Sequence, residues 1–210
     1  MSFRSQRELA VLLSKLQGFD HPSFQLEQYA TPSSLAAEWV WNMALRGEIA
    51  GKVILDAACG PGILGIGVLL LGAKKVFFLD TDQKVLSLCQ ENYEHIKKEY
   101  AVGKAEFLAL DIALFDERVD IVVQNPPFGT KTEHADRRFL EKAFSIAPCV
   151  YSMHKWSTRR FVESISRDRG FQITEVWKYD FPLPAQFSFH NKPVQKIEVG
   201  LWKMEKVTTS

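Results

Sequence analysis

The stretch that decides the fold is KVILDAACGPG-ILGIGVLLLGA-KKVFFLDTD, residues 52–82. Its pattern predicts a buried strand, a glycine turn, a helix and a second strand, a βαβ unit whose two strands run parallel. The turn, residues 60–65, fits G-x-G-x-x-G, and Asp80 follows Gly60 by twenty residues. Such glycines permit a tight turn and close approach of a ligand, while the carboxylate accepts ribose hydroxyls. The stretch therefore predicts a site for an adenosine-containing cofactor and leaves its identity open.

Asp56 narrows the choice of cofactor, because it lies at the end of the first strand, four residues before Gly60. A carboxylate in this place would repel a pyrophosphate and attract an ammonium or sulfonium group. S-adenosylmethionine carries both cations and no phosphate, so Asp56 favours it over a dinucleotide. The alternative is a structural carboxylate that caps nearby loop amides.

Carboxylates also follow the next two expected strands. Asp80 is expected to hold the ribose, and helix capping is its alternative role, although Asp82 is better placed to cap. Asp111 could accept a hydrogen bond from the adenine amino group, and Ile112 could donate its backbone N–H to a ring nitrogen. An ordinary turn is the alternative for Asp111.

The loop Asn125-Pro126-Pro127-Phe128 follows the apolar strand expected at 118–124. Asn supplies a carboxamide oxygen, and each Pro supplies a carbonyl without a competing N–H, so the loop is rich in acceptors. An amino group could donate its two hydrogens to the Asn125 oxygen and the Pro126 carbonyl, while Phe128 offers an aromatic face to a planar substrate. A simple turn is the alternative. Because this loop and the carboxylates stand at successive strand ends, the set predicts methyl transfer to a nitrogen.

Composition bounds the other possibilities. The 210 residues are 46% apolar and hold 26 Lys plus Arg against 25 Asp plus Glu, which suits one globular domain and names no charged partner. Residues 149–210 hold ten basic and six acidic residues, so any basic face is expected there. Cys59, Cys89 and Cys149 lack metal-ligand spacing. We expect reduced thiols, a cytoplasmic protein, no metal site, and no membrane segment.

The chain resembles the class I S-adenosylmethionine-dependent methyltransferases that methylate amino groups, whose signature Asn/Asp/Ser-Pro-Pro-Tyr/Phe/Trp is matched by residues 125–128. Further stretches are similar to a narrower family, the ribosomal RNA adenine-N6 methyltransferases called methyltransferase-like protein five. These stretches are LEQYATP (26–32), NPPFGTK (125–131), VYSMHK (150–155), KYD (178–180) and FHNK (189–192). The resemblance spans nearly the whole chain.

This resemblance implies an α/β, Rossmann-like fold with a seven-stranded, mostly parallel sheet, a C-terminal antiparallel strand and helices on both faces. Residues 1–210 would form one domain, with an N-terminal helical extension (1–45) and a catalytic core (46–210). Further expected elements are helices at 5–17, 33–45, 83–98, 136–147 and 157–169, and strands at 105–110, 149–153, 171–181 and 194–204.

The implied activity is methyl transfer from S-adenosyl-L-methionine to N6 of an adenine in RNA, with ribosomal RNA of the small subunit as the expected substrate. Catalytic residues would be Asn125, Pro126, Pro127 and Phe128. Cofactor-binding residues would be Gln28, Thr31, Asp56, Ala58, Gly60, Pro61, Gly62, Ile63, Asp80, Asp111, Ile112 and Asn125. Family members commonly have Gly where this chain has Ala58.

Two stretches mix cations with aromatic residues, which suits phosphate contact and base stacking. These stretches, 154–160 and 186–192, predict the substrate-binding residues His154, Lys155, Arg159, Arg160, Phe189, His190 and Lys192, and the family resemblance at 125–131 adds Lys131. A solvated helix start and an aromatic hairpin packed on the core are the alternatives.

Three other functions remain open at this point. A protein glutamine N5-methyltransferase of the release-factor type would need the same acceptors, because a side-chain amide presents the same two hydrogens. A non-catalytic S-adenosylmethionine-binding scaffold and a nicotinamide dehydrogenase are the others. The resemblance also implies, as a possible partner, a small zinc-binding activator protein that pairs with the sheet edge.

Overall fold

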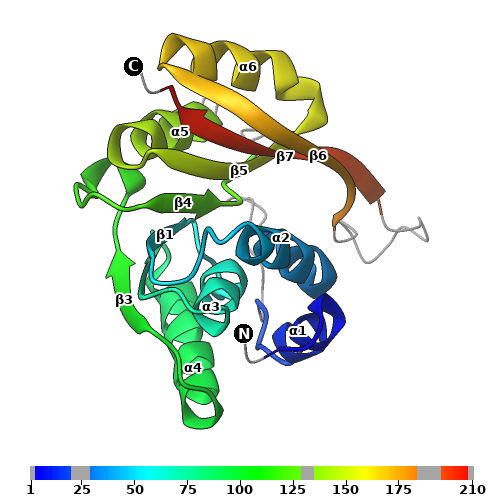
Figure 1. The fold of residues 1–210 in the computed structure, drawn as a ribbon, viewed down its shortest axis with the longest axis vertical. Coiled ribbons are helices and arrows are strands. Elements are labelled where there is room, and N and C mark those ends of the chain that lie inside the picture. Colours follow the sequence, from blue (N-terminus) through cyan, green and yellow to red (C-terminus); the bar gives the residue numbers. More distant parts are fainter. Residues whose placement is uncertain (1–2, 20–28, 129–134, 184–194, 208–210) are drawn as a thin grey trace.

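The computed structural model describes residues 3–19, 29–128, 135–183 and 195–207. Within these residues the core is one seven-stranded sheet in the order β3-β2-β1-β4-β5-β7-β6 (Figure 1). The strands are β1 (Val53–Ala57), β2 (Lys75–Asp80), β3 (Lys104–Ala109), β4 (Ile121–Gln124), β5 (Cys149–Lys155), β6 (Phe171–Leu183) and β7 (Gln195–Lys206). The helices are α1 (Gln6–Leu13), α2 (Ser33–Leu45), α3 (Ile63–Leu70), α4 (Gln83–Glu99), α5 (Ala135–Ile146) and α6 (Arg159–Asp168).

The direction of the strands confirms the predicted fold class. Strands β1 to β5 pair in parallel, whereas β7 is antiparallel to both β5 and β6. Strand β1 lies between β2 and β4, so the chain winds away from it in both directions. In open α/β sheets such a reversal leaves a crevice at the carboxyl ends of the strands.

Two hydrophobic clusters hold the layers together. Ile54 and Val123 belong to the cluster that includes α1 to α4, whereas Leu55 and Val122 belong to the cluster of α5 and α6. The central strands are buried on both faces, which explains why their sequences are continuous apolar runs and do not alternate.

The N-terminal helices belong to the first of these clusters. Ser5 caps α1 by accepting a hydrogen bond from the Glu8 backbone N–H at 3.2 Å. Leu9, Leu13 and Trp39 are buried against the same cluster as the sheet. The first two helices therefore stabilise the core directly.

The element boundaries differ from the predictions at α1, which ends at Leu13 and not at 17, at β4, which begins at Ile121 and not at 118, and around β5 to β7. Strand β5 continues to Lys155, beyond the expected end at Met153, because it pairs with β7 as far as Val199. A 3-10 turn, Trp156–Thr158, then precedes α6, which begins at Arg159 and not at 157. Neither a helix able to span a membrane nor a group of three or more residues suited to a metal ion occurs among the described residues.

Gly65 provides a test of the packing between α3 and the sheet. A Cβ on Gly65 would lie 2.2 Å from the Phe78 ring and 2.9 Å from Asp56 Oδ2. We expect Gly65→Ala to lower the free energy of unfolding by about 2 kcal/mol, because overpacking outweighs the helix propensity gained. Urea denaturation measures this. Gly18→Ala, where nothing lies within 4 Å of the added Cβ, is the matched control and should change stability little; equal effects would contradict this packing.

Candidate functional site

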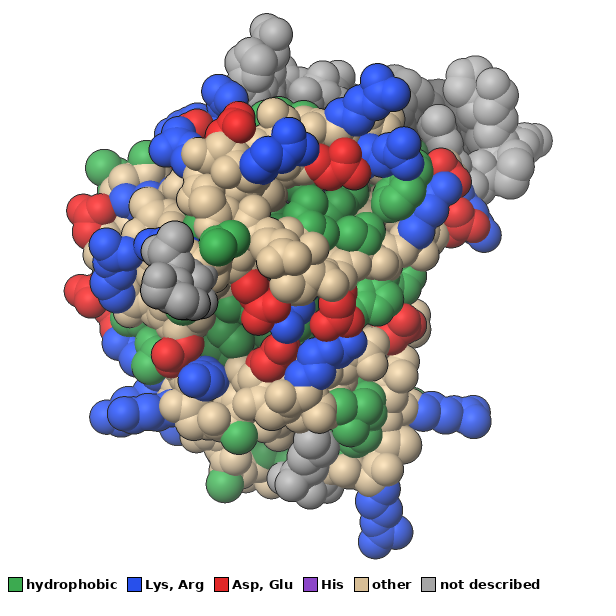
Figure 2. Space-filling view, turned by 45° about the horizontal axis from the view of Figure 1, so that its top comes forward, with side chains coloured by type: hydrophobic (Ala, Val, Ile, Leu, Met, Phe, Trp, Pro, Cys, Tyr) green, Lys and Arg blue, Asp and Glu red, His purple; other side chains and the backbone are tan. Residues whose placement is uncertain are grey.

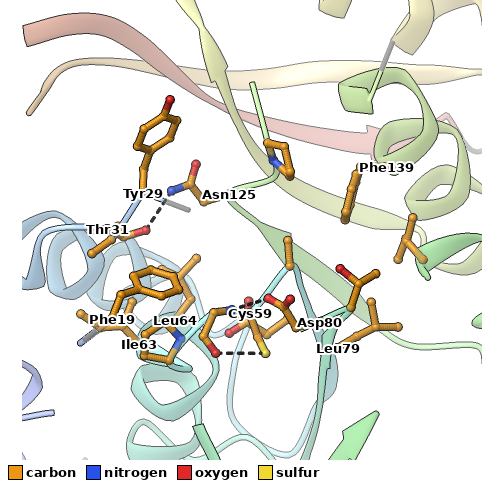
Figure 3. Close-up of a pocket in the computed structure, with 18 of the residues that line it drawn as sticks. Phe19, Tyr29, Thr31, Cys59, Ile63, Leu64, Leu79, Asp80, Asn125 and Phe139 are labelled. Carbon is orange, nitrogen blue, oxygen red and sulfur yellow. Dashed lines mark hydrogen bonds between the residues drawn. The ribbon is translucent and has the colours of Figure 1, made fainter. Parts of the chain in front are cut away.

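A pocket of about 400 Å³ opens at the carboxyl ends of β1, β2 and β4 (Figure 3). Its volume suits a small-molecule ligand. Most of the predicted cofactor residues line it: Thr31, Asp56, Ala58, Gly60, Pro61, Ile63, Asp80, Asp111, Ile112 and Asn125. Of the remaining two, Gly62 shapes the turn beneath the pocket, and Gln28 lies outside the described residues.

The glycine turn requires glycine for two reasons. Gly62, the residue that precedes α3, has a left-handed φ of 89°, and a Cβ there would lie 2.4 Å from Cys89 Sγ. Ala58 is also left-handed, with φ 56°, which costs a non-glycine residue about 1–2 kcal/mol. This backbone explains why glycine suits the position of Ala58.

Asp56 fulfils the capping role that was its alternative, and it also lines the pocket. Its Oδ2 accepts a hydrogen bond of 2.7 Å from the Gly65 N–H in the first turn of α3. The side chain is 1% exposed, and this burial, with a smaller contribution from Asp80, raises its pKa to about 8 against the opposing effect of the Gly65 bond. The protein alone therefore favours a neutral Asp56 at pH 7, and a cationic ligand beside it would favour the ionised form.

Asp80 and Asp82 divide the roles considered for the end of β2. Asp82 caps α4 by accepting from the Lys84 and Val85 N–H groups at 3.0 and 3.4 Å. Asp80 instead accepts from Gly60 N–H and Asp82 N–H, both at 3.0 Å, and lines the pocket. Burial is the main cause that raises its pKa. Asp80 thus fastens the glycine turn to β2 and keeps a carboxylate at the pocket wall.

Asp111 is engaged by a residue that the sequence analysis missed. Its Oδ1 accepts from Ala113 N–H at 2.9 Å, and both carboxylate oxygens accept from Arg138 Nη2 at 2.8 and 3.0 Å. Arg138 and its neighbour Phe139 come from the start of α5 and line the pocket. The available signal was their position in the first turns of the helix that follows the Asn-Pro-Pro loop.

Asn92 is a second missed residue, and it lies beneath the glycine turn. Its carboxamide accepts from Gln17 N–H at 2.9 Å and donates to Gln17 O and Pro61 O at 2.9 and 3.0 Å. Phe19, two residues beyond Gln17, packs its ring against Gly60. Asn92 therefore ties the segment after α1 to the turn.

The acceptor loop leads from β4 to the rim of the pocket. Asn125 and Pro127 line the pocket, while Pro126 is buried. Asn125 Nδ2 donates to Thr31 Oγ1 at 3.0 Å. Phe128 is 5% exposed and packs between Tyr29, with ring centroids 5.9 Å apart, and Phe181 at 6.0 Å. Tyr29 lines the pocket in this arrangement, and Phe128 does not.

The predicted substrate-binding residues separate into three groups. Arg159 and Arg160 are exposed and Lys155 is half-buried. The structure corrects the prediction for His154, which is 1% exposed and hydrogen-bonded to Ser152 at 2.6 Å. Burial lowers its pKa to about 3, so His154 offers no cation to a substrate. Lys131, Phe189, His190 and Lys192 lie outside the described residues.

Comparisons with known proteins identify the family. The family model "Conserved hypothetical protein 95" matches residues 35–167. The Drosophila melanogaster rRNA N(6)-adenosine-methyltransferase Mettl5 is 34% identical, with 95% of each chain covered. The chain belongs to the METTL5 family.

Solved structures agree with this family assignment. A proposed RNA methyltransferase of Pyrococcus horikoshii is 42% identical, with a TM-score of 0.86 over 99% of this chain and 100% of that one. The Synechocystis magnesium protoporphyrin IX methyltransferase, solved with bound SAM, shares the fold at 14% identity, with a TM-score of 0.67 over 99% and 100% of the two chains. The METTL5 family thus has the class I methyltransferase fold predicted from the sequence.

The raised pKa of Asp56 predicts a specific pH dependence of stability. The folded chain holds the Asp56 proton up to about pH 8, whereas the unfolded chain releases it near pH 4. Because the native state binds the extra proton between these values, stability should fall as pH rises, by up to about 1.4 kcal/mol per pH unit. Asp56→Asn should remove this contribution. Urea denaturation from pH 5.5 to 7.5 measures how the free energy of unfolding changes with pH in the wild type and in Asp56→Asn. Identical slopes in the two proteins would contradict the raised pKa of Asp56.

Proposed function

We propose that this protein transfers a methyl group from S-adenosyl-L-methionine to N6 of an adenine in RNA, with small-subunit ribosomal RNA as its substrate. The observation that carries the proposal is the acceptor-rich loop of Asn125 at the rim of a pocket whose walls contain Asp56 and Asp80. A METTL5 relative of nearly equal length is named an rRNA N(6)-adenosine-methyltransferase. Both lines lead to the same chemistry.

The pocket suits this cofactor better than a dinucleotide. Asp56 and Asp80 stand beside the glycine turn, where an ammonium or sulfonium group would favour their ionised forms, whereas a pyrophosphate would disfavour them. Arg138 is the cation among the described lining residues, and its guanidinium is paired with Asp111. When bound, the cofactor supplies a methyl group activated by its sulfonium.

The acceptor loop would prepare the amino group for attack. Adenine N6 is a weak nucleophile because its lone pair is delocalised into the ring. Asn125 Oδ1 and the Pro126 carbonyl would accept its two hydrogens, favour a pyramidal nitrogen and direct the lone pair at the methyl group. The N6 lone pair would form the new bond to the methyl carbon while the bond from that carbon to the sulfonium sulfur breaks and its electron pair stays on sulfur. The proton that the methylated nitrogen then loses would pass to solvent. The protein contributes position and electrostatic stabilisation without a covalent intermediate.

A strip of cations and aromatic rings at the end of β5 is suited to RNA. Trp156 stacks on Trp202 at 6.0 Å, and Arg159 and Lys178 lie 5.7 and 5.0 Å from its ring centroid. Figure 2 looks toward the α6 side, where Lys and Arg side chains stand among Asp and Glu side chains. Because the cations are interspersed with acidic side chains and Lys178 is paired with Glu198, we expect only a few phosphate contacts next to an unpaired base.

The proposal extends to the setting of the enzyme. Strand β3 is an edge of the sheet, and a small zinc-binding activator protein could add to it by strand pairing. Residues 1–210 would act as one methyltransferase domain, since α1 and α2 pack on the same core as the sheet. The unpaired state of Cys59, Cys89 and Cys149 is consistent with a cytoplasmic location.

Labelled cofactor tests the reaction and the role of Asn125 together. Incubation with separated ribosomal RNA and ribosomal protein fractions should label RNA, and digestion should release N6-methyladenosine. Asn125→Ala should reduce transfer by about 10²-fold or more, because it removes an acceptor aimed at the reacting nitrogen, while cofactor affinity stays near normal. Label confined to the protein fraction would support the glutamine methyltransferase instead, and an active Asn125→Ala variant would refute the mechanism.

Charge reversal tests the basic strip. The double variant Arg159→Glu/Arg160→Glu should weaken RNA binding and lower the slope of log K against log salt concentration by about 1.5, since two phosphate contacts are lost. Binding titrations from 50 to 200 mM salt measure both effects. The matched control is Lys97→Glu/Lys98→Glu, at the exposed end of α4. If both double variants change RNA affinity and its salt dependence equally, the basic strip has no specific role in RNA binding.

A further inference from the structure

Thr31 reaches the acceptor loop from a distant part of the chain. It lies two residues before α2, is 8% exposed, and its Oγ1 accepts from Asn125 Nδ2 at 3.0 Å. In Figure 3 the Asn125 nitrogen points to Thr31, and the carboxamide oxygen points away from it. The pair joins residues 94 positions apart in the sequence.

We propose that Thr31 is a positioning residue that holds the Asn125 carboxamide with its oxygen toward the amino group to be methylated. This inference rests on the proposed function. The amino group of the substrate presents only hydrogen-bond donors to the loop. If the Asn125 NH2 faced the substrate, two donors would meet and no hydrogen bond could form. Thr31 receives the NH2 end and leaves the oxygen for the substrate.

The backbone around Asn125 explains why a side-chain constraint is needed. Pro126 and Pro127 have fixed φ angles, and Pro126 also restricts the backbone of Asn125 to extended conformations. The remaining freedom is the Asn125 carboxamide, whose terminal torsion is broad and nearly two-fold. A hydrogen bond to its nitrogen therefore supplies the constraint that the two prolines cannot supply.

The sheet explains why this constraint comes from the N-terminal region. Val123 belongs to the cluster that contains α2, and Gln124 bonds to Ser152 at 2.9 Å. Because successive residues of a strand point to opposite faces, Asn125 faces the α2 side. Thr31 is placed on that side by the start of α2 at Ser33. The Thr31 hydroxyl accepts a hydrogen bond from the Asn125 NH2 group, which would otherwise lack this partner at a part-buried position.

Two substitutions at Thr31 separate orientation from packing. Thr31→Val keeps the shape and removes the hydroxyl, so kcat should fall about tenfold or more while KM for RNA and cofactor affinity change little. Thr31→Ser keeps the hydroxyl and should restore kcat nearly to that of the wild type. Ser166→Ala, which removes a hydroxyl that is 1% exposed and remote from the pocket, is the control and should leave kcat unchanged.

A second measurement does not depend on the substrate. The Asn125 side-chain NH2 resonances of the wild type and Thr31→Ser should be shifted and protected from exchange, and Thr31→Val should lose both features. If the wild type fails to methylate RNA but these resonances behave as expected, the proposed function fails and the contact stands. If Thr31→Val keeps the wild-type kcat, or if its defect is confined to cofactor affinity, the positioning role is refuted.

Discussion

The parallel pairing of β1 with β2 and β4 is the constraint on which the site depends. In register, Asp56 lies opposite Phe78 on one side and Val123 on the other. Neighbouring strands are about 4.8 Å apart, so their carboxyl ends bring Asp56, Asp80 and Asn125 to one edge of the sheet. The hydrogen bonds of the strand ladder therefore set where these three side chains stand at the pocket.

Two side-chain carboxamides then attach the N-terminal region to that edge. Asn92 bonds the residues after α1 to the glycine turn, and Asn125 bonds Thr31 just before α2. The bonds of Asn92 to Gln17 and of Asn125 to Thr31 cross 75 and 94 positions of the chain. The N-terminal region is therefore part of the pocket as well as of the core, with Phe19 and Tyr29 among the lining side chains.

Acidic and basic side chains occupy different places around the site. The pocket presents buried carboxylates and carbonyl acceptors, an environment that favours cations and N–H donors and disfavours phosphate. The proposed function nevertheless requires that the phosphates of an RNA substrate be neutralised. Cations lie elsewhere, at Lys155, Arg159 and Lys178 near the end of β5, so in the proposed function the attraction of RNA and the chemistry on its base would use separate surfaces.

The sequence by itself determined the order of strands and helices, the glycine turn, the carboxylates at the strand ends and the acceptor loop. These features are local, because periodicity, turn chemistry and strand ends are set by residues close together in the chain. Only the tertiary structure decided that Phe128 packs beneath Tyr29, that His154 is buried and neutral, and that Arg138 pairs with Asp111. Burial and distant contacts decide what a side chain can do, and both arise only when separate elements pack together. The partner of Asn125 was hidden for the same reason, since Thr31 meets it only across the folded sheet.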